Sequence, residues 1–349
     1  MAGLTVAVSL VTLNSEQYIE QCLDTVFSQT GVHLEVVVVD NASTDDTRKL
    51  LAKYRPRLRL IRNDRNVGFA AAQNQGIACS TAPWVLVLNP DVLLGENFLK
   101  TLLKGAEADT RVGTICGKLL SIGRGFTALP EPKIDSAGIY FTPAMRHFDR
   151  GWGEPDDGRY ERLEYVFGAC AAAALYRRAM IDDISIHGEF FDPDFFVYRE
   201  DADVAWRAQL LGWSCLYMPI ALAHHVRTVK PPTRKSVAPL FNMHSVKNRF
   251  LMRIKNLTPI VWRRCWARMM FRDLMVIGGC VFREPRSLEA FWRLAWCWRR
   301  AWRKRHWIMA RRRASDVELA WWFRPEPAVV PLETDPEGTT SLAAARLRR

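Results

Sequence analysis

The first ninety residues alternate between short apolar runs and longer amphipathic stretches. The apolar runs have the length of β-strands and are Thr5–Thr12, Leu34–Val39, Leu58–Ile61 and Trp84–Leu88. Between the first two runs, apolar residues recur at helical spacing and predict one buried stripe, formed by Ile19, Cys22, Leu23, Val26 and Phe27. Gly31 is expected to end this helix, and Gly68–Ala78 predicts another. Strand and helix alternating at this spacing indicate an α/β fold with an open, mostly parallel sheet.

Two aspartates directly follow buried strands of this sheet. Asp40 comes after the second run, and Asp91 lies in the segment Asn89-Pro90-Asp91 after the fourth. Ligands of open parallel sheets bind beyond the carboxyl ends of the strands, so we expect both side chains at one rim. Asp40 could bind a base or ribose, or it could cap the next helix. Asp91 could bind a divalent cation, or it could form a turn before the next element.

Further candidates for chemistry lie in the middle of the chain. Glu200, Asp201 and Asp203 stand within four positions, after an aromatic segment and at the start of an expected helix. Carboxylates in a first helical turn are stabilised by the helix dipole, but such a cluster also suits a base in a cleft. His224-His225 follows the apolar run Leu216–Ala223 and is either a metal ligand or structural.

Composition excludes several classes of protein. The chain has 349 residues, of which 49% are hydrophobic and 25% charged, which is typical of a globular protein. No apolar run approaches the roughly 20 residues that a membrane-spanning helix needs. Met1–Leu13 lacks the features of a secretory signal. The eight cysteines form no CxxC pair and no ligand spacing with histidine, which favours reduced thiols in a cytoplasmic protein.

Positive charge is concentrated in one segment of the chain. The whole chain carries a formal net charge of +12, with 49 Lys and Arg against 37 Asp and Glu. Between Arg227 and Arg313 there are 23 basic and 3 acidic residues, so the rest of the chain is net acidic. An uneven distribution of this kind predicts an anionic partner for the basic segment alone.

Tryptophan and arginine interleave from Pro259 to Arg313. An apolar stripe at helical spacing is made of Leu288, Phe291, Ala295, Trp298 and Trp302. Arg293, Arg300 and Lys304 point roughly the opposite way. This pattern is typical of a helix lying in anionic lipid headgroups. The alternatives are a helix that packs its tryptophans on the body of the protein, and nucleic-acid binding, which no recognition motif supports.

Read together, the motifs resemble the inverting family 2 glycosyltransferases of the GT-A fold, and among them the rhamnosyltransferases of bacterial polysaccharide assembly. The resemblance extends from about Val6 to about Asn256 and depends on the order of short motifs. They are Val11-Thr12-Leu13-Asn14, Val39-Asp40-Asn41-Ala42-Ser43, Asn66-Val67-Gly68-Phe69-Ala70, Leu88-Asn89-Pro90-Asp91, Asp135-Ser136-Ala137-Gly138, Phe167-Gly168-Ala169, Glu200-Asp201-Ala202-Asp203, Pro219 with His225, and Lys247-Asn248-Arg249.

The resemblance implies a nucleotide-binding set and a metal site. It implies that Thr12 and Asp40 hold a pyrimidine base, and that a stretch along the ribose and phosphates includes Asn66, Gly68 and Asn74. It implies that Asp91 and His225, with His224 as the alternative, bind Mg²⁺ or Mn²⁺. Two positions depart from the family pattern. Asn89 stands where the fuller motif has Asp, which leaves the cation held mostly through the diphosphate, and Leu13 stands where Tyr is frequent.

The resemblance also implies the reaction. Asp201 is the expected catalytic base, with Glu200 and Asp203 supporting the acceptor side of the site. The expected enzyme moves a sugar, with rhamnose as a candidate, from a UDP- or dTDP-sugar to a hydroxyl of a glycan or lipid-linked acceptor. The alternatives are an inactive protein of the same fold that binds nucleotide sugars or membranes, and a two-carboxylate glycosidase.

Three regions follow from these patterns. We expect a GT-A catalytic domain over 1–256, a basic helical membrane-associating extension over 257–325, and a flexible tail over 326–349. The expected location is the cytoplasm, at the inner face of the cell membrane.

Overall fold

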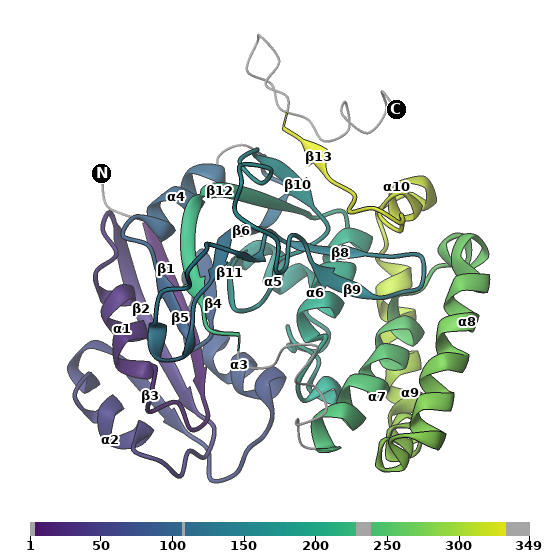
Figure 1. Ribbon diagram of the computed structural model, residues 1–349, viewed down its shortest axis with the longest axis horizontal. Helices are drawn as coiled ribbons and strands as arrows, with labels where there is room; N and C mark the ends of the chain where they lie inside the picture. Colours follow the sequence, from purple (N-terminus) through teal and green to yellow (C-terminus); the bar gives the residue numbers. More distant parts are fainter. Residues whose placement is uncertain (1–3, 107–108, 228–238, 333–349) are drawn as a thin grey trace.

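A large mixed sheet forms the centre of the molecule (Figure 1). The computed structural model describes residues 4–106, 109–227 and 239–332. The sheet has 11 strands, in the order β13-β10-β12-β6-β11-β4-β1-β2-β3, with β5 paired to β12 and β7 paired to β6. The strands are β1 Leu4–Thr12, β2 Val32–Asp40, β3 Arg59–Arg62, β4 Trp84–Leu88, β5 Val92–Leu94, β6 Val112–Ser121, β7 Ile134–Ser136, β10 Glu164–Val166, β11 Ala173–Arg177, β12 Ser214–His225 and β13 Val330–Pro331; β8 Ile139–Phe141 and β9 His147–Asp149 form a separate pair.

Helices cover both faces of this sheet and extend from one end of it (Figure 1). The α-helices are α1 Ile19–Phe27, α2 Thr47–Ala52, α3 Phe69–Ile77, α4 Phe98–Gly105, α5 Arg178–Ile184, α6 Glu200–Leu210, α7 Pro239–Asn256, α8 Pro259–Phe282, α9 Glu289–Ala310 and α10 Asp316–Trp321. Short 3-10 turns are η1 Arg55–Arg57, η2 Arg124–Phe126, η3 Pro193–Phe195 and η5 Pro285–Leu288.

The α/β fold predicted from the sequence is confirmed. β1 pairs in parallel with β2 and β4, and β2 pairs in parallel with β3. Successive side chains of a strand point to opposite faces, so Val6, Val8 and Leu10 enter one apolar layer with α1 and α4, whereas Ala7 enters the other with α3, α5 and α6. β11 is antiparallel to both of its neighbours, β4 and β6.

The first helix ends earlier than its sequence predicts. α1 stops at Phe27, and Ser28 follows it with a backbone N–H bonded to Asp24. Gly31 lies beyond the helix, has a φ of +73°, and turns the chain into β2. The glycine therefore serves the turn into the strand rather than the helix end.

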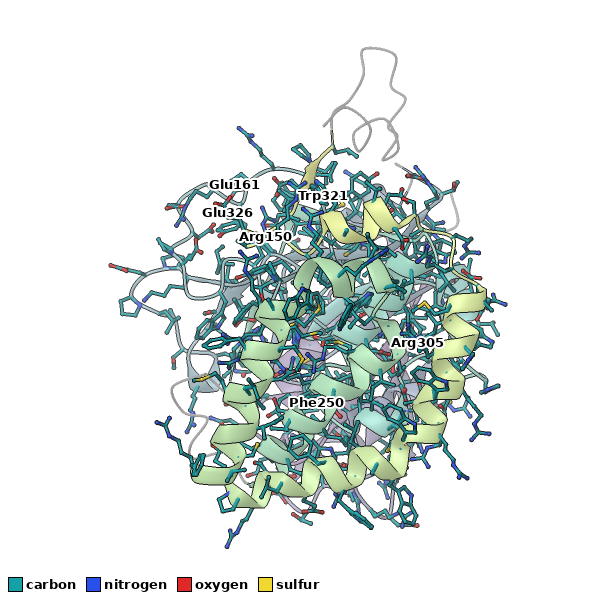
Figure 2. All side chains as sticks on the ribbon, turned by 90° about the vertical axis from the view of Figure 1, so that its right-hand side faces the viewer. Arg150, Glu161, Phe250, Arg305, Trp321 and Glu326 are labelled. Atoms are coloured by element: carbon teal, nitrogen blue, oxygen red, sulfur yellow. The ribbon has the colours of Figure 1, made fainter. Side chains whose placement is uncertain are left out.

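The C-terminal helices share the apolar core of the body. α7, α8 and α9 form the right-hand side of Figure 1, which faces the viewer in Figure 2. Cys265 of α8 and Ala301 and Ile308 of α9 are buried in the same cluster as Trp206 of α6. Within the described ranges, none of the helices combines the length and the apolar character that a bilayer crossing requires.

The structure decides which side of α9 meets the body. Ala290, Cys297, Ala301 and Ile308 are buried, whereas Trp298 and Trp302 are 49% and 44% exposed. The helix therefore packs on the body through these buried residues and through the partly buried Trp307, whereas Trp298 and Trp302 remain about half exposed. Arg300 and Lys304 form ion pairs with Asp194 and Asp192 of the body.

The predicted tail is only partly described. Within 326–349, β13 pairs antiparallel with β10 at the sheet edge, and residues 333–349 lie outside the described ranges.

Candidate active site

The rim at the ends of β1 and β2 is built around Asp40. This carboxylate is fully buried and accepts a hydrogen bond from Arg48 Nε at 2.5 Å. Its other oxygen accepts from the backbone N–H of Ser43 at 3.3 Å and from Thr12 Oγ1 at 3.4 Å. Thr12 stands opposite Asp40 in the parallel register. Asp40 therefore fixes the loop after β2, as a turn residue does, while it also lies at the rim where ligands of such sheets bind.

The loop before α3 lies next to this rim. Asn66 Oδ1 accepts from Asn41 Nδ2 at 2.8 Å and from the backbone N–H of Gly68 at 2.9 Å. Gly68 has a φ of +87°, and a Cβ atom there would lie 2.6 Å from the ring of Phe196. The close approach to Phe196 thus requires glycine at this position.

Asn74 joins α3 to the segment that precedes η3. Its Nδ2 donates to the carbonyl of Phe191 at 2.7 Å, and its Oδ1 accepts from the Phe191 backbone N–H at 2.9 Å. Both polar ends of the Asn74 amide are therefore engaged by the protein backbone.

Asp91 and His225 come together although 134 positions separate them in the sequence. β5 follows Asp91 and pairs with the end of β12, where His225 stands opposite Val92. The Nε2 atom of His225 lies 3.5 Å from Asp91 Oδ1, and its Nδ1 atom lies 2.7 Å from Asp135 Oδ2. Neighbouring residues of a strand face opposite sides, and it is His225 rather than His224 that meets Asp91.

Opposite charges determine the protonation of this group. Burial disfavours the charged imidazole, but Asp135 and then Asp91 raise the pKa of His225 to about 10. Burial likewise disfavours the charged form of Asp135, and His225 and Arg227 overcome it and lower the pKa of Asp135 to about 2. His225 thus forms a buried ion pair with Asp135 when no cation is bound.

The donor atoms of Asp91 and His225 fit a divalent cation shared with a diphosphate. A carboxylate that binds the second nitrogen of a histidine, as Asp135 does, is the usual support of a ligating imidazole. No group of three His, Cys, Asp or Glu that could hold a metal ion occurs in the described part of the chain. With two protein ligands, the remaining ligands of such a cation would be phosphate oxygens and water.

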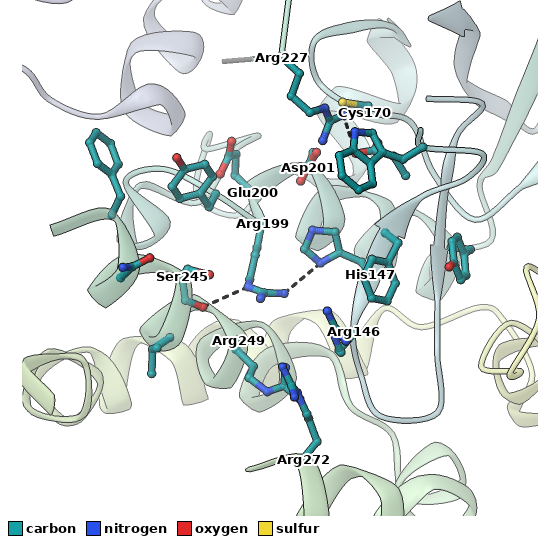
Figure 3. A pocket seen from close by; sticks show the side chains of 18 of the residues that line it. Arg146, His147, Cys170, Arg199, Glu200, Asp201, Arg227, Ser245, Arg249 and Arg272 are labelled. Atoms are coloured by element: carbon teal, nitrogen blue, oxygen red, sulfur yellow. Dashed lines mark hydrogen bonds and ion pairs between the residues drawn. The ribbon is translucent and has the colours of Figure 1, made fainter. Parts of the chain in front are cut away.

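Arg227 connects this pair to a cavity. Its Nε donates to Asp135 Oδ1 at 2.7 Å, and its Nη2 donates to Asp149 Oδ2 at 2.7 Å. Asp149 ends β9 and lines a cavity of about 510 Å³. Arg227 and Asp201 line the same cavity (Figure 3). A continuous chain of contacts therefore extends from Asp91 through His225, Asp135 and Arg227 to Asp149.

Asp201 lies in the first turn of α6, after Arg199 in a left-handed conformation. Its Oδ1 accepts from the backbone N–H of Ala202 at 2.7 Å. Burial, and then the charge of Asp149, raise the pKa of Asp201 to about 6. A carboxylate with this pKa is ionised at neutral pH and binds a proton more readily than an ordinary aspartate does.

The neighbours of Asp201 differ in what they touch. Glu200 lines the same cavity, and burial followed by the charge of Asp201 raises its pKa. Asp203 points away from the cavity and is fully buried among Arg207 Nε at 2.9 Å, Lys255 Nζ at 2.8 Å and Asn256 Nδ2 at 2.7 Å. Asp203 therefore supports the site indirectly, by tying α6 to α7.

The sequence reasoning assigned no role to three residues of this network. Asp135 was part of a motif, but Arg227 and Asp149 gave no separate signal. Arg227 stands two positions after His225, at the end of β12, and this proximity to a candidate ligand was the signal that could have identified it.

Comparison with known proteins gives consistent results. Residues 7–185 match the sequence family described as Glycosyl transferase family 2. The chain is 28% identical over 237 residues to an N-acetylglucosaminyl-diphospho-decaprenol L-rhamnosyltransferase of Mycobacterium tuberculosis, over 62% of this chain and 74% of that protein.

Two solved structures show the same fold. S. aureus TarS 1-349 in complex with UDP-GlcNAc has a TM-score of 0.54 at 16% identity, over 88% of this chain and 91% of that one. GalNAc-T7 with UDP, GalNAc and Mn²⁺ has a TM-score of 0.56 at 15% identity over 72% of this chain, which spans about half (48%) of that protein.

Proposed function

This chain belongs to glycosyl transferase family 2 and is a glycosyltransferase, and from that premise we propose that it transfers a sugar with inversion from a UDP- or dTDP-sugar to an acceptor hydroxyl. One observation carries the proposal. Asp201 lines a cavity and has a raised pKa, and the contact chain from Asp91 to Asp149 ends in the same cavity. An acceptor bound in that cavity would place its hydroxyl beside Asp201, facing a donor bound at the rim near Asp91.

Asp201 acts as the general base in this proposal. It takes the proton of the acceptor hydroxyl while that oxygen attacks the anomeric carbon, and the bond from the carbon to the diphosphate oxygen breaks on the opposite face. The nucleoside diphosphate leaves, and the new glycosidic bond has inverted configuration. Such a base contributes about 10²–10⁴ in rate, and alignment of the reactants supplies much of the remainder.

Asp91 and His225 would hold the divalent cation, Mg²⁺ or Mn²⁺. Such an ion neutralises the charge that develops on the departing diphosphate. Asp135 orients the His225 ring through Nδ1 at 2.7 Å and so keeps Nε2 directed at Asp91. The Mn²⁺ in the GalNAc-T7 structure supports the presence of a divalent cation.

The donor nucleotide would occupy the rim beyond β1 and β2. Thr12 and Asp40 are proposed to bind the pyrimidine base, and Asn66 and Gly68 to lie along the ribose and phosphates. Asn74 acts in this proposal by holding Phe191 in place, since its amide both donates to and accepts from the backbone of Phe191.

The name of one relative supports a choice of sugar and acceptor for this proposal. The mycobacterial relative is named a rhamnosyltransferase acting on a diphospho-decaprenol, which supports rhamnose and a lipid-linked or glycan acceptor in cell-surface polysaccharide assembly.

The helical extension is proposed to rest on an anionic membrane surface at the cytoplasmic face. Trp292 and Trp296 of α9 are 72% and 73% exposed, and arginines alternate with apolar residues along α8 and α9. Exposed tryptophan beside basic charge is the composition of an interfacial helix.

Asp201→Asn tests the proposed reaction. With a panel of UDP- and dTDP-sugars, the wild-type protein should release nucleotide in the presence of Mg²⁺ or Mn²⁺, and the variant should lose at least about 10²-fold in turnover. Nucleotide affinity, measured by calorimetry, should not change. Asp64→Asn, at an exposed position, is the control for removing one carboxylate.

Two outcomes would contradict the proposal. Equal turnover in the Asp201 variant would exclude Asp201 as the base. A wild-type protein that binds nucleotide sugars but never cleaves the nucleotide from the sugar would favour the inactive alternative.

A further inference from the structure

The cavity beside Asp201 has a second, cationic end that the proposed reaction does not use. Figure 3 shows Asp201 and Arg227 at one end of the cavity and three other arginines at the opposite end. These three are Arg146, from the turn between β8 and β9, Arg249 of α7 and Arg272 of α8. Segments far apart in the sequence thus place their guanidinium groups around one space.

The carboxylate beside Arg249 is shared with a second arginine. Asp273 accepts from Arg249 Nε at 3.2 Å with one oxygen and from Arg253 Nη2 at 2.7 Å with the other, so one carboxylate serves two cations. The buried Nε of Arg272 has no hydrogen-bond partner within the described ranges. A buried N–H group without a partner is costly and indicates a missing acceptor.

The arginines also act on the pKa of neighbouring groups. Burial, followed by Arg199, Arg249 and Arg146, lowers the pKa of His147, which also lines the cavity. Burial and then Arg253 lower the pKa of Arg249 to about 10. By contrast, Arg227 at the other end of the cavity is balanced by Asp135 and Asp149.

An apolar hollow adjoins the cationic end. A second cavity of about 520 Å³ shares Arg146, Phe148 and Arg272 with the first, and its other lining residues include Ala267 and Phe271 of α8. Phe271 is 69% exposed, and α8 also exposes Leu274, at 66%, which does not line this cavity. The carboxylate of Asp201, the three arginines and the apolar hollow therefore follow one another along these two adjoining cavities. They suit a ligand that carries a hydroxyl, an anionic group and an apolar chain in this order.

We propose that Arg146, Arg249 and Arg272 bind the diphosphate of an acceptor whose sugar is joined through it to a prenyl chain. The sugar reaches Asp201, the diphosphate lies among the arginines, and the prenyl chain follows the hollow along α8. This inference rests on the proposed glycosyl transfer and specifies its acceptor. Guanidinium groups bind phosphate oxygens through charge-assisted hydrogen bonds. Arg249, whose Nε and Nη2 already donate to Asp273 and to the Ala144 carbonyl, would contribute mainly its charge. The donor diphosphate has a separate place, because neither Asp91 nor His225 lines this cavity.

Direct binding tests the site without catalysis. The full chain is titrated with farnesyl diphosphate, farnesol and inorganic pyrophosphate in the presence of Mg²⁺, first without UDP and then with excess UDP. Farnesyl diphosphate should bind at least about tenfold more tightly than either partial probe, because only it engages both the arginines and the apolar hollow.

Matched variants assign the binding to the arginines. Arg272→Gln and, separately, Arg146→Gln should weaken farnesyl diphosphate binding by about tenfold or more, the loss of one charge-assisted pair. Arg263→Gln removes the same charge from an exposed position of α8 that lines neither cavity, and should bind as the wild type does. Unchanged binding in Arg272→Gln, equal binding of pyrophosphate and farnesyl diphosphate, or displacement of the probe by UDP would overturn the proposal.

Kinetics separates this inference from the reaction itself. Against a prenyl-diphosphate sugar acceptor, Arg272→Gln should raise the KM for the acceptor with little change in kcat. Against the same sugar as a short alkyl glycoside, the variant and the wild type should be alike. If the wild type transfers to the alkyl glycoside but the variant is equally impaired with both acceptors, glycosyl transfer stands and the diphosphate site is refuted.

Discussion

Asp201 owes its raised pKa to two causes that can be separated by substitution. Burial is the larger, and the charge of Asp149 is the next. The base must be ionised to accept a proton, so kcat/KM should rise with pH through about 6 and level off above it.

Asp149→Asn should move this rise to lower pH. Removing the negative charge makes the ionised form of Asp201 easier to reach, and the loss of the ion pair with Arg227 leaves more positive charge nearby, which acts in the same direction. The measurement is the pH dependence of kcat/KM. Glu154→Gln, which lines the same cavity and bonds Tyr160, is the control and should leave the midpoint in place. A midpoint that moves upward in Asp149→Asn would contradict the electrostatic account.

Gly68 offers a test of the close approach between the loop before α3 and Phe196. Gly68→Ala should lower the free energy of unfolding by about 1–3 kcal/mol, because the new Cβ clashes with Phe196 and the φ of +87° is strained for alanine. Gly188→Ala is the matched control, since Gly188 has a φ of +82° with nothing within 4 Å of its would-be Cβ. Urea denaturation should show a larger loss at position 68, and equal losses would mean that the contact with Phe196 is unimportant.

Single residues were predictable where a short motif marked them. Asp40, Asp91 and Asp201 each follow or begin an element that periodicity identifies. Arg227 and Asp149 were not predictable. Their role depends on an ion pair between residues 78 positions apart, and no local sequence pattern encodes such a contact.

At the scale of elements, α8 and α9 present the exposed apolar and basic surface proposed to meet lipid. The double variant Trp292→Glu/Trp296→Glu should reduce binding to anionic vesicles by about tenfold or more. Glutamate buries less apolar area in the membrane than tryptophan does, and anionic lipids repel its negative charge. Co-sedimentation with vesicles measures the effect. Val317→Glu of α10, at an 81% exposed position, is the control for an added charge. Unreduced binding in the double variant would place the contact elsewhere.

Helical periodicity predicted the apolar stripe of α9 but not the direction in which it faces. The helix carries small and apolar residues on both sides, so its amphipathic pattern is ambiguous. The ion pairs of Arg300 and Lys304 with Asp194 and Asp192 determine which side of α9 faces the body. These carboxylates lie about a hundred positions away in the sequence. Deletion of 286–349 would therefore remove core residues as well as lipid-facing ones, so single substitutions are the sharper test.

At the scale of the whole molecule, the first half of the sheet was predictable and the second half was not. β1 to β4 follow one another through short helices, which is the local signature of parallel pairing. In the second half β12 lies between β6 and β10, and β13 reaches the sheet from the far end of the chain. Pairings across such separations depend on the fold as a whole.

The pairing of β13 with β10 bears on how the protein should be produced. Val330 stands opposite Tyr165 at this edge of the sheet, so a recombinant fragment that stops at residue 328, and so keeps the C-terminal helices, leaves the backbone groups of Glu164–Val166 without this partner. Unprotected strand edges recruit further strands. Light scattering should find such a fragment self-associating, whereas protein ending at residue 332 should remain monodisperse.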